Sequence, residues 1–179
     1  MSDPDSKNQT HPAAWPVEQL VAQCDTQRTR RGGPGGQHRN KTETAIVMTH
    51  RETGVSGQAS ERRSQKDNRE AAIFRLRLNL AVAVRTDKDS AEETALPSEL
   101  WRGRASGGKM SVSASHADFP ALVAEGLDWI FAYEFDLSAA AKGKLGLSTS
   151  QLIKFLKLCP EAWQLVQQRR HENGMPRLK

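Results

Sequence analysis

The apolar positions of the first half of the chain follow two patterns. Residues 42–50 (TETAIVMTH) are rich in β-formers, and the polar RETG and VSGQAS stretches follow. This order predicts a β-hairpin with Gly54 in its turn. Further on, Ile73, Leu76, Leu80 and Val84 fall on one helical face, and Ser64 can cap a helix that starts there. The stretch from Leu76 also alternates at period two, but its length and alanine content favour the helix.

The second half reads as helical. Asp118 can cap a helix with Pro120 in its first turn, ending near Phe135. Three further helices are expected, the last ended by Asn173-Gly174, and they cover residues 137–144, 148–158 and 160–171.

These elements predict an α+β fold in two parts. A small domain of sheet plus helix is expected at residues 15–90, and a small all-α domain at 118–179. We expect residues 1–14 to be a disordered tail, because they are polar and contain Pro4 and Pro12. Residues 91–117 read as a polar linker with one ordered turn around Leu100 and Trp101. Glycines in it would let the two parts move, namely Gly103, Gly107 and Gly108.

Residues 137–158 have the pattern of a helix-turn-helix, with Gly146 at the turn and Ser148 as the cap of the second helix. An ordinary helical hairpin, an RNA- or ribosome-binding element and a DNA-binding element all fit this pattern.

Composition and charge narrow the range of partner classes. The 179 residues carry a net charge of +5, and the mean hydropathy is -0.65 with a pI near 9.5. Nucleic acid is the commonest partner of such a chain, an anionic membrane surface the next, and a merely soluble basic protein the plain alternative. No apolar run reaches the ~18 residues that a membrane span needs. Cys24 and Cys159 form no CxxC pair, so neither a zinc site nor a disulfide framework is expected. No other metal and no cofactor is expected. Without a secretory or transit signal, a cytoplasmic location is expected.

Residues 28–41 (RTRRGGPGGQHRNK) contain the most unusual composition, with neither an acidic nor a large apolar residue. Such a segment cannot bury enough surface to order itself and should be an exposed loop. Glycine lets a main chain approach a ligand closely. A nucleotide-binding loop is disfavoured, because no Lys-Ser/Thr follows at the required spacing. A plain flexible linker explains the glycines but not the Gly-Gly-Gln sequence.

Two motifs in this region resemble those of one family. Gly33 to Thr42 matches the pattern G-P-G-G-Q-H-x-N-K-T, with Arg39 in the variable position. Arg63-Ser64-Gln65 followed by Asn68-Arg69 is similar to R-S-Q-x-x-N-K, with arginine in place of the lysine. Together they resemble the catalytic GGQ domain of the class I peptide chain release factors, over roughly residues 20–85.

The resemblance implies hydrolysis of peptidyl-tRNA in the ribosomal peptidyl transferase centre, with Gly35, Gly36 and Gln37 as catalytic residues. In the family, the main-chain N–H of the glutamine stabilises the oxyanion that forms when water attacks the ester, a contribution of ~10²–10³ in rate for one such donor. The glutamine side chain helps to position water, and no acid–base triad is needed from the protein. The implied partners are the ribosome and a methyltransferase that modifies Gln37, and the protein is expected to be a monomer.

Basic residues around the two motifs are expected to contact RNA. His38 is open to a second interpretation as a general base, although nothing nearby forms a dyad with it. For the other basic residues, the alternative to RNA contact is a solvated charged face. The expected RNA-binding residues are Arg28, Arg30, Arg31, His38, Arg39, Asn40, Lys41, Arg62, Arg63, Lys66 and Arg69.

Nothing else in the sequence resembles the stop-codon-reading domain of the family. We therefore expect a codon-independent factor that rescues stalled ribosomes. Two alternatives stay open at this point. One is a non-catalytic ribosome- or RNA-binding protein that retains the loop, and the other is a DNA-binding regulator built on the helical part.

Overall fold

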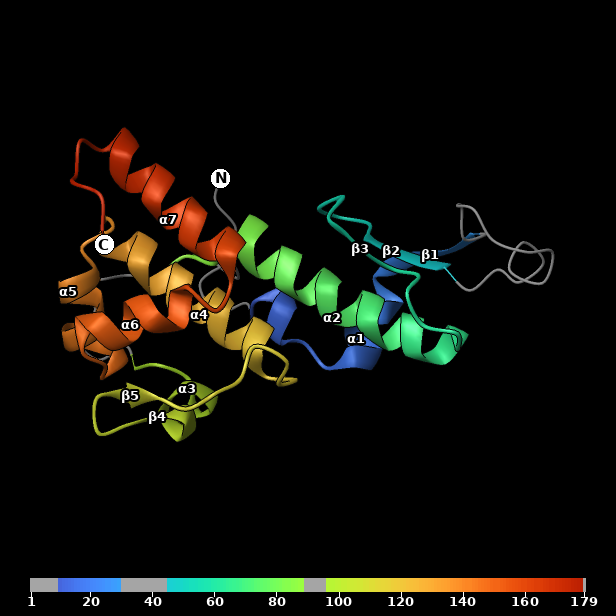
Figure 1. Cartoon of the computed structure of the whole chain (residues 1–179), viewed down its shortest axis with the longest axis horizontal. Helices are drawn as coiled ribbons and strands as arrows, with labels where there is room; N and C mark the ends of the chain where they lie inside the picture. Colours follow the sequence, from blue (N-terminus) through green and yellow to red (C-terminus); the bar gives the residue numbers. More distant parts are fainter. Residues whose placement is uncertain (1–9, 30–44, 89–95, 179) are drawn as a thin grey trace, which may run out of the picture.

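The computed structural model describes residues 10–29, 45–88 and 96–178. Small antiparallel sheets and several helices follow one another along the chain, so the predicted α+β class is confirmed (Figure 1). The elements of the first half are η2 (Pro12–Ala14), α1 (Val17–Ala22), β1 (Cys24–Thr29), β2 (Ala45–His50), β3 (Ser56–Ala59) and α2 (Gln65–Ala83). Those of the second half are α3 (Glu99–Arg104), β4 (Ala105–Ser106), β5 (Lys109–Met110), α4 (Phe119–Ala132), α5 (Leu137–Ala140), η3 (Ala141–Leu145), α6 (Thr149–Leu156) and α7 (Pro160–Glu172).

The first sheet is three-stranded and antiparallel, in the order β1-β2-β3. The predicted hairpin is confirmed as β2 and β3, and Gly54 has φ +69° in its turn. Strand β1 was not predicted, because its sequence CDTQRT is polar and, of residues 24–28, only Cys24 is buried. The loop expected from Arg28 therefore starts later, since Arg28 lies within β1 and pairs with Ile46.

Helix α2 begins after Ser64, as predicted, and the Ser64 Oγ accepts a hydrogen bond from the Asp67 N–H at 3.4 Å. Its apolar face packs on the sheet through buried Ile73, Leu76 and Leu80. The approach to β3 is very close at Gly57, where an added Cβ would lie 2.3 Å from the Leu76 nitrogen.

The start of the described chain is folded, so the expected disordered tail is wrong for residues 10–14. Ala13 is fully buried in the short helix η2, and His11 is 6% exposed. The His11 ring accepts from the Ala13 N–H at Nδ1 (3.0 Å) and bonds the Val84 carbonyl at Nε2 (3.1 Å), as the neutral tautomer allows. Burial lowers the pKa of His11 from 6.5 to about 4. Residues 1–9 lie outside the described residues.

The segment expected to be a linker holds more structure than one turn. It contains α3 and the β4–β5 hairpin, and Trp101 is fully buried with its Nε1–H donating to the Leu145 carbonyl at 2.9 Å. Gly107 and Gly108 have φ +56° and +73° in the hairpin turn, so they shape a turn here and do not loosen a tether. The division of the chain at residues 90 and 118 stays a prediction, with residues 89–95 outside the described ranges.

The predicted C-terminal helices are present with small differences. Asp118 precedes α4 but makes no capping bond, because its carboxylate pairs with Arg104 at 2.7 Å. Helix α5 continues as the π-helical turn η3, and Gly146 ends it with φ +65°. The Ser148 Oγ caps α6 by accepting from the Gln151 N–H at 3.3 Å. Helix α7 ends before Asn173, as expected.

The two halves share one hydrophobic core, because α4 packs directly against α2. A buried ion pair ties them at the end of α2, where Arg85 Nη1 lies 2.9 Å from Asp128 Oδ1. Asp128 also accepts hydrogen bonds from the N–H and the hydroxyl of Thr86. The Arg85 guanidinium lies over the Phe131 ring, 5.3 Å from its centroid. The helical part therefore completes the core around α2.

Candidate functional site

The segment that carries Gly35, Gly36 and Gln37 joins two paired strands. β1 ends at Thr29 and β2 begins at Ala45, and these two residues are partners in the antiparallel register. The catalytic candidates themselves lie in residues 30–44, outside the described residues, so their roles stay predictions. The same holds for the RNA-binding candidates Arg30, Arg31, His38, Arg39, Asn40 and Lys41.

The other RNA-binding candidates are described and are exposed. Arg28 lies on β1, whereas the other four, Arg62, Arg63, Lys66 and Arg69, lie at the beginning of α2 and in the residues just before it. We call these four residues the α2 basic cluster. Their exposure suits contact with phosphate groups, although exposure alone does not distinguish this from a solvated face.

The strand register places the two groups at one edge of the sheet. Arg28 is opposite Ile46, and Ile46 is opposite Ala59, the last residue of β3. The chain therefore leaves β1, enters β2 and leaves β3 at the same end. Figure 1 shows the start of α2 at this end of the molecule, far from the C-terminal helices. The ends of the Gly-Gly-Gln segment and the α2 basic cluster thus lie at the same end of the sheet, which the sequence alone did not show.

Asn68 holds the chain of the α2 basic cluster in place. Its side chain is fully buried, with Oδ1 accepting from the Arg62 N–H at 2.9 Å and Nδ2 donating to the Arg62 carbonyl at 3.0 Å. Asn68 belongs to the second sequence motif, but no role was predicted for it. An asparagine in the first turn of a helix, where a side chain can bond nearby main chain, was the available signal.

An acidic residue beside the cluster is neutralised by α2. The Glu61 carboxylate accepts from Arg75 Nη2 at 2.8 Å and Nη1 at 3.1 Å. This bidentate bond with Arg75 lowers the pKa of Glu61 to about 2. Arg75 also donates to the Gln58 carbonyl at 2.7 Å, which connects α2 to β3. The pairing means that Glu61 does not face the cluster as a free anion.

The described part of the chain offers no metal site, since no group of three or more His, Cys, Asp or Glu side chains could hold an ion there. Both cysteines are free and buried. None of the described helices is long and apolar enough to cross a membrane.

Comparison with known proteins decides the family. The RF-1 domain matches residues 17–113, more than half of the chain. The chain belongs to the RF-1 domain family. The match includes the whole sheet and α2, and it extends past the region of the sequence resemblance to include α3, β4 and β5.

The relatives of this RF-1 domain chain are peptide chain release factors. Peptide chain release factor 1 of Symbiobacterium thermophilum is 40% identical over 91 residues, which are 51% of this chain and 24% of that protein. Peptide chain release factor 1 of Xylella fastidiosa is 46% identical over 63 residues, 35% of this chain and 18% of the relative. The chloroplastic peptide chain release factor PrfB1 of Arabidopsis thaliana is 48% identical over 58 residues, which are 32% of this chain and 13% of that protein. The chain thus matches less than a quarter of the length of these relatives. No solved structure matches it.

Proposed function

We propose that this RF-1 domain protein promotes hydrolysis of peptidyl-tRNA on the ribosome. The observation that carries the proposal is the Gly35-Gly36-Gln37 sequence inside the family match. A degenerate RNA-binding relative could lose these three residues without cost, whereas a hydrolytic factor could not.

The chemistry required of the protein is modest. Attack of water on the ester carbonyl creates negative charge on the oxygen, and a fixed main-chain N–H at that point lowers the barrier. In our proposal the Gln37 N–H supplies this donor, and the Gln37 side chain positions the water. Gly35 and Gly36 allow a main-chain path that a Cβ would hinder. The proton transfers are left to groups of the ribosome and the substrate.

The described residues support docking on RNA at the same edge. Exposed Arg28 and the α2 basic cluster lie where β1 ends and β2 begins, and Glu61 there is paired with Arg75. Basic groups beside the loop would neutralise phosphates and release counterions as the loop enters an RNA-lined tunnel. A monomer suffices for this task, and we propose Gln37 as a substrate for a methyltransferase.

The finer proposal is that release requires no stop codon and serves stalled ribosomes. It keeps the expectation of the sequence analysis and is tested by the experiment below. The cytoplasmic location belongs to the same set of proposals.

The experiment compares ribosomes that carry a labelled peptidyl-tRNA and differ only in the A site. One complex has a stop codon there, one a sense codon, and one a message that ends at the P site. We expect the purified chain to release peptide from the last complex. Release only with the stop codon would contradict codon independence, and release from none would contradict hydrolysis.

The competing function is a ribosome-binding protein without hydrolytic activity. Its support is the exposed Arg28 with the α2 basic cluster, which would bind RNA whether or not the loop is active. Ribosome binding without peptide release in any of the three complexes would favour it.

A further inference from the structure

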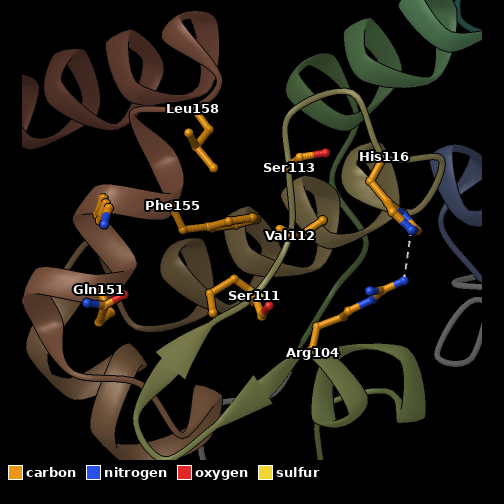
Figure 2. Close-up of a pocket in the computed structure, with 10 residues that line it drawn as sticks. Arg104, Ser111, Val112, Ser113, His116, Gln151, Phe155 and Leu158 are labelled. Atoms are coloured by element: carbon orange, nitrogen blue, oxygen red, sulfur yellow. Dashed lines mark hydrogen bonds between the residues drawn. The ribbon is translucent and has the colours of Figure 1, made fainter.

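A cavity of about 520 Å³ lies between α6 and the chain that follows β5, on the C-terminal half of the molecule (Figure 2). Its volume is within the range of sites that hold a small ligand or an anchoring side chain. It is built from α3, β5 and α6 and contains none of the residues assigned to hydrolysis or RNA contact.

The floor and wall of the cavity are apolar. Figure 2 shows Phe155 pointing in from α6, with Val112 facing it and Leu158 at the upper wall. The Phe155 ring is held by edge-to-face contacts with Trp101 and Phe119, at centroid distances of 5.6 and 5.8 Å. Leu158 is 41% exposed at the edge of this floor. The site thus offers a rigid apolar floor and an apolar edge open to solvent.

The rim of the cavity is positive. Two of its lining residues, Arg104 and Lys154, are cationic, and none is acidic. Arg104 is already engaged, because its Nη2 bonds Asp118 at 2.7 Å and His116 at 3.0 Å. Lys154 is exposed and has no hydrogen-bond or ion-pair partner in residues 10–29, 45–88 or 96–178. Lys154 is therefore available for an incoming anion.

Main-chain and amide groups beside the floor are also unpaired. The Ser111 N–H donates to the Arg104 carbonyl at 3.0 Å, but neither the N–H nor the carbonyl of Val112 has a main-chain partner within the described ranges. The Gln151 side chain, one helical turn before Lys154, likewise has no partner there. These groups can bond the main chain of an extended peptide.

We propose that this cavity binds an extended segment of a partner protein. The segment places an apolar side chain against Val112 and Leu158 and pairs an acidic side chain with Lys154. RNA fits the cavity less well. The Phe155 ring is 2% exposed and presents no free face for a base to stack on, and the His116 ring is held at its edge by Arg104 and the Asp118 N–H. The proposal does not depend on peptidyl-tRNA hydrolysis.

The test uses short random peptides displayed on phage, selected on the full chain. The selected peptides are then synthesised with a fluorescent label and measured against the chain and its variants. We expect them to combine acidic and large apolar residues. Lys154→Glu and Leu158→Asp should each weaken binding about tenfold or more, since each removes a central contact of the bound segment. Lys142→Glu is the matched control, because Lys142 is an exposed lysine on η3 that does not line the cavity.

Both test residues are exposed, so the variants should keep the melting temperature of the parent, which is measured in parallel. A labelled single-stranded oligoribonucleotide is the competing probe. Three results would each overturn the proposal: failure to select a peptide, selected peptides that bind both variants as well as the parent, or oligoribonucleotide binding that Lys154→Glu and Leu158→Asp abolish.

Discussion

The buried side-chain amide of Asn68 bonds both main-chain polar groups of Arg62, accepting from its N–H at 2.9 Å and donating to its carbonyl at 3.0 Å. The two residues are six positions apart, so this pair closes the turn that leads from β3 into α2. The pair therefore holds the main chain from which the exposed Arg62 and Arg63 side chains project.

Replacing Asn68 by Ala should therefore weaken ribosome binding. It removes two buried hydrogen bonds, which costs about 1–3 kcal/mol of stability, and it frees the main chain of Arg62. We expect lower affinity in a sedimentation assay and a shallower salt dependence, because fewer phosphates are neutralised. Asn79→Ala is the matched control, since Asn79 lies on the same helix and its amide bonds the Ser56 carbonyl at 2.7 Å, away from the cluster. Equal ribosome affinity for the two variants would contradict this role of Asn68.

Gly57 sets the distance between β3 and α2. A Cβ there would lie 2.3 Å from the Leu76 nitrogen and 2.4 Å from the Ala72 oxygen, and both are main-chain atoms that cannot rotate away. Gly57→Ala should lower the free energy of unfolding by about 1–3 kcal/mol or more. Gly103→Ala is the control, because a Cβ in α3 would meet nothing within 4 Å and alanine favours a helix. Denaturant unfolding compares them, and an unaffected Gly57 variant would mean that β3 and α2 are not packed this closely.

The Arg85–Asp128 pair should be a main attachment between the two halves. Arg85→Met leaves Asp128, 1% exposed, without its cation, and loss of one partner of a buried pair costs about 3–5 kcal/mol. The double variant Arg85→Met with Asp128→Leu should recover most of this loss, since it removes the uncompensated charge. Urea unfolding of the two variants is the measurement. A single variant as stable as the parent would show that the halves do not meet there.

Stability should fall on mild acidification because of His11. Its pKa is about 4 in the folded chain and near 6.5 when unfolded, so between these values only the unfolded state takes up the proton. The contribution of neutral His11 to the free energy of unfolding is complete above pH 6.5 and is lost as the pH falls to 4. It amounts to as much as about 3 kcal/mol. His11→Gln should flatten the dependence of unfolding free energy on pH in this window. Parallel curves for variant and parent would mean that His11 is not buried.

The sequence alone predicted elements whose patterns are local. The β2–β3 hairpin followed from residues 42–60 and its Gly54 turn, and α2 followed from its cap and apolar face. The sequence predicted the helices better than it predicted the residues that cap them. Ser64 and Ser148 act as expected, but Asp118 is drawn away by Arg104, a partner that its own neighbourhood in sequence does not reveal.

What the sequence could not show depends on contacts between distant segments. The polar strand β1 is held by pairing with β2, and Trp101 is buried by contacts with the distant elements α4, η3 and α6. For the same reason residues 10–14 looked like part of a tail, although His11 and Ala13 pack at the end of α2. The candidate site, too, was visible in part from the sequence. The two motifs and their basic residues were visible in the sequence. The position of Arg28 and the α2 basic cluster at the same end of the sheet, and the role of Asn68, required the strand register and the packing of α2.

The central claim is that Gly35-Gly36-Gln37 carries out peptide release, and the most direct measurement is release of labelled peptide from ribosomes whose message ends at the P site. We expect the parent chain to release peptide well above the spontaneous rate. Gly35→Ala with Gly36→Ala should abolish release while ribosome binding and melting temperature stay close to those of the parent, because a Cβ hinders the required main-chain path. Release by the double variant at the rate of the parent would contradict the claim.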